Sequence, residues 1–87
     1  MKFVPGPRVG VVDAGDAVYV APLPDGPILI LRDVSAVAWR GVRQGGLKEM
    51  VARVAAATGE GADDIEPHLH AFVDDLCARG LLVLTAD

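Results

Sequence analysis

The hydrophobic pattern changes within one stretch of the chain, Gly26-Pro27-Ile28-Leu29-Ile30-Leu31-Arg32-Asp33-Val34-Ser35-Ala36-Val37-Ala38-Trp39-Arg40-Gly41-Val42. Residues 28–31 form an unbroken aliphatic run, which is typical of a short strand. From Asp33 onward the apolar side chains recur at helical spacing. Asp33 itself is well placed to cap the first turn with its carboxylate. The stretch therefore predicts a strand that leads directly into a helix.

Two more strands are expected before this stretch. Residues 8–12 and 17–21 have strand-like composition, and the Asp/Gly-rich segment 13–16 between them is typical of a tight turn. Residues 1–8 contain Pro5, Gly6 and Pro7, so we expect an irregular lead-in. Three short strands joined by turns predict an antiparallel meander with one packed face.

Three helices are expected after the strands. Gln44-Gly45-Gly46 should end the first, and an apolar stripe over residues 47–55 indicates the second. The third begins with Asp63 or Asp64 as its cap and ends near Gly80. Residues 81–84 fit either a last strand or a tail packed over the core. The sequence thus predicts a single α+β domain over residues 1–87, ordered strand, strand, strand, helix, helix, helix.

Composition and charge limit the possible partners and compartments. The chain has 87 residues, a net charge of −4 and scattered basic residues, which argues against nucleic-acid binding. Cys77 is the single cysteine, so an intrachain disulfide is excluded and a cytoplasmic location is expected. No apolar run approaches the roughly 20 residues of a membrane span, so we expect no membrane association.

The residues that could carry chemistry are not arranged for it. His68 and His70 point to different sides of a helix and cannot share a metal ion. Asp63-Asp64 and Asp74-Asp75 are adjacent carboxylates, whereas catalytic pairs face each other across a cleft. Cys77 has no base placed to activate it. We therefore expect no metal, no cofactor and no enzymatic activity.

The chain resembles the PqqD-like domains, also called RiPP recognition elements, which bind the leader peptides of ribosomally made precursor peptides. The first match is Leu31-Arg32-Asp33-Val34-Ser35-Ala36-Val37-Ala38-Trp39, a strand-to-helix signature. The second lies within residues 65–82, where His70-Ala71-Phe72-Val73-Asp74-Asp75-Leu76 leads to Arg79-Gly80-Leu81-Leu82. Gly41 departs from the pattern, because a larger aliphatic residue is common there.

This resemblance implies a winged-helix-like domain that captures a leader peptide between the third strand and the third helix. The resemblance also implies that such a domain delivers the bound precursor to a modifying enzyme or a leader peptidase. An edge strand independently supports such capture, because its unpaired backbone groups can accept another strand. The resemblance and the edge together place the peptide-binding residues at Ile28, Leu29, Ile30, Leu31, Arg32, Leu69, Phe72, Val73, Asp74, Asp75 and Leu76. Alternation lets only one of the pairs Ile28/Ile30 and Leu29/Leu31 face the core, and the sequence leaves both choices open.

Two other functions stay open at this point. The related topology of winged helices suggests a nucleic-acid-binding domain, which the acidic composition disfavours. A small homodimer that pairs through the same strand edge is the other alternative. Asp74 or Asp75 has two interpretations as well, either a solvated helix face or an ion-pair partner for a basic residue of the peptide.

Overall fold

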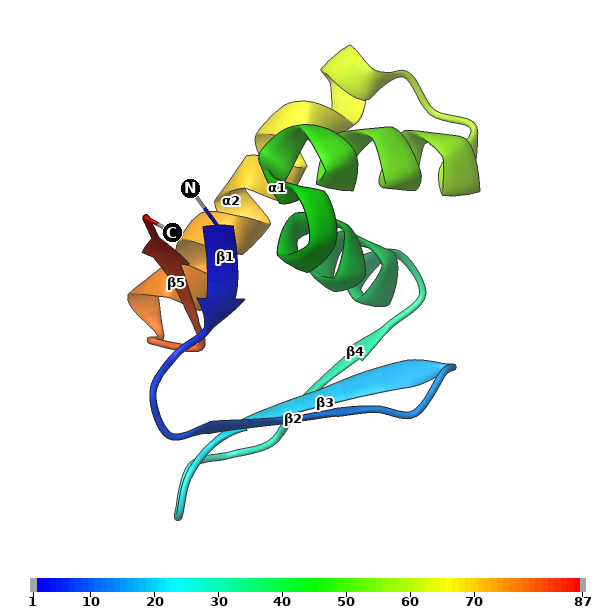
Figure 1. Ribbon diagram of the computed structural model, residues 1–87. Coiled ribbons are helices and arrows are strands. Elements are labelled where there is room, and N and C mark those ends of the chain that lie inside the picture. Colours follow the sequence, from blue (N-terminus) through cyan, green and yellow to red (C-terminus); the bar gives the residue numbers. More distant parts are fainter. Residues whose placement is uncertain (1, 87) are drawn as a thin grey trace.

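The computed structural model describes residues 2–86, and its helices and strands divide into two small sheets and two helical elements (Figure 1). In chain order these elements are β1 (Lys2–Pro5), β2 (Val9–Asp13), β3 (Ala17–Pro22), β4 (Leu29–Arg32), α1 (Val34–Thr58), α2 (Ala62–Ala78) and β5 (Leu82–Thr85). The expected α+β class is confirmed.

The three expected strands form one antiparallel sheet in the order β2-β3-β4. Its register pairs Val18 with Leu31 and Val20 with Leu29. All of these except the half-buried Leu29 are fully enclosed in the core, because alternate residues of each strand point to the helices. The sheet has two edges, β2 and β4, and α1 covers one of its faces (Figure 1).

The first two expected helices belong to one helical element, so the count of three is not confirmed. The expected break does mark a kink in α1: Gly46 has φ 83° and ψ −165°, which is not helical. The kink folds the two halves of α1 onto each other. A Cβ at Gly41 would lie 2.8 Å from Cα of Met50, so only glycine permits this close approach. The absence of a larger aliphatic residue at this position thus has a packing reason.

The helix starts differ from those expected. Asp33 occupies the cap position of α1 but makes no side-chain cap bond, and its φ of 53° turns the chain sharply out of β4. Gly61, rather than an aspartate, caps α2, while Asp63 and Asp64 lie in the first turn. There their carboxylates face the positive end of the helix dipole.

The lead-in expected to be irregular contains strand β1, which pairs antiparallel with β5. Lys2 lies opposite Thr85 and Pro5 opposite Leu82, so a last strand, not a tail, follows α2. Gly6 continues the connection, because its N–H donates to the carbonyl of Leu81 at 3.2 Å. The pairing in this sheet was not predicted, because its two strands stand at opposite ends of the chain.

The core lies between the three-stranded sheet and the helices and is aliphatic apart from Trp39. None of the helices in residues 2–86 combines the length and apolar character that crossing a bilayer requires.

Candidate functional site

Strand β4 has one face in the core and one in solvent, which answers the question that the sequence left open. Leu31 is only 3% exposed and Leu29 is half-buried, whereas Ile28 and Ile30 are 65% and 48% exposed. The inward pair is therefore Leu29/Leu31. Ile30 lies on the outer face of β4, and Ile28 is exposed directly before the strand, so two isoleucines at this edge are an unusual exposure of apolar surface.

The backbone groups of β4 also alternate, and their directions follow from bonds at both ends of β3. The N–H of Ala14 donates to the carbonyl of Ala17, and the N–H of Leu23 donates to the carbonyl of Arg8. Odd-numbered residues of β3 thus bond to the β2 side, and Val18 and Val20 to the β4 side. Their partners Leu31 and Leu29 face β3 in turn. The N–H and C=O of Ile30 therefore point away from the sheet, into the open edge.

The residues expected on the α2 side are placed in two different environments. Leu69, Val73 and Leu76 are buried in the core at 6%, 3% and 1% exposure, so they support the helix rather than offering an open surface. Phe72 is half-buried and Asp75 is exposed. Helical spacing puts these two on one face of α2, together with Arg79.

Asp74 and Asp75, though adjacent, serve different surfaces. The Asp75 carboxylate accepts a bond from Nε of Arg79 at 2.9 Å. Asp74 instead lines a small cavity with Phe3 and Leu84, on the side of α2 that faces β1 and β5. The structure thus separates Asp74 from the β4 edge and leaves Asp75 as the acidic residue on the Arg79 side.

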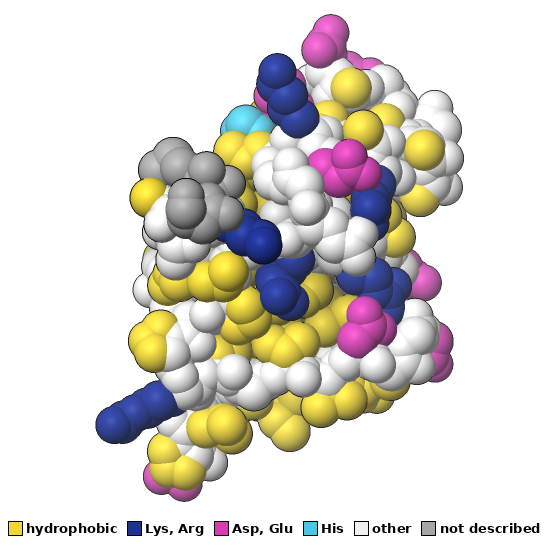
Figure 2. Space-filling view, viewed as in Figure 1, with side chains coloured by type: hydrophobic (Ala, Val, Ile, Leu, Met, Phe, Trp, Pro, Cys, Tyr) yellow, Lys and Arg dark blue, Asp and Glu magenta, His cyan; other side chains and the backbone are white. Residues whose placement is uncertain are grey.

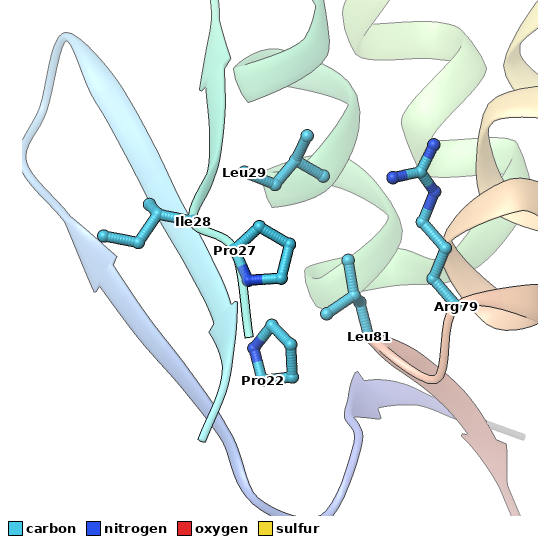
Figure 3. Close-up of a pocket in the computed structure, with 6 residues that line it drawn as sticks. All are labelled: Pro22, Pro27, Ile28, Leu29, Arg79 and Leu81. Atoms are coloured by element: carbon cyan, nitrogen blue, oxygen red, sulfur yellow. The ribbon is translucent and has the colours of Figure 1, made fainter. Parts of the chain in front are cut away.

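A cavity of about 410 Å³ lies where β4 begins and α2 ends (Figure 3). In Figure 3 the side chain of Leu29 points toward Arg79 and Leu81, while Ile28 points the other way. The lining is largely apolar, with the Arg79 guanidinium as its charged group: Pro22, Pro27, Ile28, Leu29, Arg79 and Leu81. Ile28 and Leu29 were predicted as site residues from the sequence, and the other four were not.

The sequence features at those four residues were local, and each had a simpler structural interpretation. The prolines were interpreted as loop residues, and Arg79-Gly80-Leu81 as the end of a helix. The left-handed φ of 74° at Gly80 makes that end a sharp turn, which brings Leu81 back toward β4. Only the tertiary structure shows that this turn and the loop before β4 border one cavity.

The opposite edge of the sheet, β2, is occupied by other groups. Arg40 of α1 binds Asp13 at the end of β2 through two bonds of 2.8 and 2.7 Å, and it also donates to the carbonyl of Gly15. The N–H of Val9 donates to the carbonyl of Gly6.

Figure 2 shows hydrophobic side chains between the helices and the sheet, flanked by basic and acidic side chains.

The chemistry available in the described part of the chain is limited. Among residues 2–86, no group of three His, Cys, Asp or Glu side chains is placed to hold a metal ion. Burial, and secondarily the Asp74 carboxylate, raises the pKa of the Cys77 thiol above its ordinary value. A raised pKa lowers the thiolate fraction near neutral pH, which disfavours a nucleophilic role for this cysteine.

Comparison with solved structures gives a match over the whole chain. It is described as "TbiB1 in Complex with the TbiA(beta) Leader Peptide", with a TM-score of 0.78, 25% sequence identity, and coverage of 100% of both chains. No curated protein sequence matches significantly. The family described as "Coenzyme PQQ synthesis protein D (PqqD)" matches residues 19–82, which is more than half of the chain. The chain therefore belongs to the PqqD-like family of RiPP recognition elements.

Proposed function

We propose that this protein binds the leader peptide of a ribosomally synthesised precursor by adding it as a further strand to β4. Family membership and the likeness to TbiB1, whose structure holds a leader peptide, support leader-peptide binding. The observation that carries strand addition is the outward direction of the Ile30 N–H and C=O on an edge strand. An added strand takes affinity from such backbone groups and specificity from pockets for its side chains.

The two edges of the sheet are not equivalent, and the difference favours β4. At one end of the β2 edge the Asp13 side chain is bound by Arg40, and at the other end the N–H of Val9 is already bonded to the carbonyl of Gly6. On β4 the backbone groups of Ile30 point outward, and the residues before Arg32 are apolar, while Arg32 itself is bonded to Ser35. A free, apolar stretch of edge is the kind that recruits another strand.

The cavity beside β4 supplies a specificity element for the same peptide. A peptide paired with β4 lies between that strand and the face of α2 that carries Phe72, Asp75 and Arg79. One of its side chains then reaches the cavity beneath Leu29. The apolar walls fit an aliphatic or aromatic side chain, and Arg79 favours an acidic group next to it.

In this function the domain delivers the precursor and catalyses no reaction itself. By holding the leader, it raises the effective concentration of the precursor at a modifying enzyme or leader peptidase. This function needs no cofactor and no metal.

The test removes the outward N–H of Ile30 and leaves the hydrogen bonds between β4 and β3 intact. Ile30→Pro removes that N–H and places a ring on the open edge, where proline is tolerated in a sheet. The matched control is Val11→Pro, because Val11 lies opposite Val20 and its N–H also points outward, on the β2 edge. Peptides are selected from a random display library on the wild-type domain, and their affinities are measured by fluorescence polarisation.

Ile30→Pro should weaken binding about tenfold or more, through the lost bond and the clash of the ring, while Val11→Pro leaves it unchanged. Circular dichroism and thermal unfolding establish that both variants are folded. Equal affinities for folded Ile30→Pro and wild type would refute strand addition at β4. Light scattering with and without peptide separates capture from self-pairing of two copies through the same edge.

A further inference from the structure

The open edge of β4 ends at a bond pair made by one serine. The N–H of Arg32, the last residue of β4, donates to Oγ of Ser35 at 3.0 Å. The Ser35 hydroxyl donates in turn to the carbonyl of Arg32 at 2.8 Å. Alternation along β4 points both Arg32 groups toward the open edge, as it does those of Ile30. A side chain from the first turn of α1 therefore occupies the backbone position where a paired strand would continue.

The other end of the edge is limited by the loop before β4. Pro27 has no N–H, and the N–H of Gly26 donates to the carbonyl of Pro22 at 2.9 Å. Between these limits, Ile30 is the outward-facing residue within β4, and the same alternation extended one step before the strand adds Ile28. Each offers one N–H and one C=O.

We infer that Ser35 sets the length and register of peptide pairing, so that a bound peptide pairs with Ile28 and Ile30 and stops before Arg32. This inference rests on the proposed strand addition. Ser35 is a positioning residue: it does not touch the peptide but removes the next pairing site. A peptide that slipped along the edge by one pair would have to displace both Ser35 bonds, so one register is favoured over its neighbour.

The sharp turn at Asp33 strengthens this limit. Its φ of 53° takes the chain off the edge immediately after Arg32, so no further strand residue lies beyond the serine. The single register then places one particular peptide side chain over the cavity at Leu29 and Arg79. Sequence selectivity in the cavity thus depends on a serine at the opposite end of the strand.

The experiment uses a peptide selected on the wild-type domain and counter-selected against Ile30→Pro. Amide hydrogen exchange is followed by NMR with and without this peptide, in wild type, Ser35→Ala and Ser35→Thr. In wild type, the Arg32 amide should exchange slowly from the start and not change on binding, while the Ile30 amide slows about tenfold or more. Ser35→Thr keeps the hydroxyl and should behave as wild type.

In Ser35→Ala, the Arg32 amide should exchange fast in the free domain and become protected by the peptide. An N-methyl scan of the peptide should show one additional sensitive position, two residues beyond those sensitive in wild type. The inference is overturned if the peptide slows Arg32 exchange in wild type, or if Arg32 of Ser35→Ala stays unprotected while Ile30 is protected. Failure to recover any peptide that depends on Ile30 would instead count against the proposed function, so the two failures are distinguishable.

Discussion

Arg40 and Asp13, which stand 27 positions apart in the chain, form a two-pronged ion pair with bonds of 2.8 and 2.7 Å. The pair ties the hairpin between β2 and β3 to the first half of α1. The pair also lowers the pKa of the Asp13 carboxyl group, chiefly through hydrogen bonding. The Arg40 hydrogen bond first, and then the backbone N–H of Gly15, lower the pKa of Asp13 from 3.8 to about 2.

The lowered pKa predicts an acid-dependent loss of stability. Because the folded-state pKa lies below the unfolded value, the pair stabilises the fold fully above about pH 4–5, and the effect disappears as the pH falls toward 2. Urea unfolding from pH 7 to pH 2 measures this effect. The difference between wild type and Asp13→Asn should be constant at the upper end and shrink below pH 4. A difference that does not change with pH would contradict the assignment.

Gly41 should not tolerate a larger side chain, because a Cβ there would meet Cα of Met50 at 2.8 Å. We expect Gly41→Val to destabilise the domain by about 1–3 kcal/mol through overpacking. The control is Ala57→Val, an exposed position in the second half of α1. It introduces the same β-branched side chain without the contact, and any loss there reflects the replacement of alanine, a better helix former than valine. Chemical unfolding compares the two, and equal losses would show that the halves of α1 can separate without penalty.

Arg79 should matter for peptide binding and hardly for stability. Its ion pair with Asp75 is exposed, so removing it costs less than about 1 kcal/mol. Arg79→Ala should nevertheless weaken a selected peptide about threefold or more, since the side chain lines the cavity. Arg53→Ala breaks the equivalent pair with Glu49 at the same helical spacing in α1. If both variants lost affinity equally, the cavity would not be the binding site.

Cys77 should react slowly with alkylating agents near neutral pH. Burial, and secondarily Asp74, raises the pKa of its thiol, so less thiolate is present than for a free cysteine. The pH dependence of the iodoacetamide rate should give a higher midpoint than glutathione does, and Asp74→Asn should lower that midpoint. A midpoint unaffected by Asp74→Asn would leave burial as the sole cause.

The sequence predicted what local pattern controls and failed where distant residues meet. The strand at 28–31 followed by a helix, the disturbance at Gly46 and the end of α2 near Gly80 were all readable from apolar spacing and glycine. The pairing of β1 with β5 was not, because Lys2–Pro5 carries a proline and its partner lies at the other end of the chain. Strand alternation was visible, but its phase became known only from the burial of Leu31.

The candidate site was predicted in part for the same reason. Residues of α2 were assigned to the groove from the family resemblance and from their helical stripe, and neither says which side of the helix meets the core. Leu69, Val73 and Leu76 turned out to be core residues. The Ser35 bonds to Arg32 and the cavity beside Leu29 depend on the turn at Asp33 and the fold-back at Gly80. The helix end at Gly80 was predicted from its glycine, but the direction in which the chain turns back there was not, and nothing in the sequence predicted the positive φ of Asp33.

The pairing of β1 with β5 ties the cavity proposed for peptide recognition to both ends of the chain. The β4 edge rests on strands that are neighbours in sequence, whereas the Leu81 wall of the cavity is fixed by Gly6 and by a two-stranded sheet closed across nearly the whole chain. Leu81 and Leu82 are also buried in the core, so this wall cannot open without exposing core side chains. Heating should therefore remove discrimination among peptides in the same transition that unfolds the domain.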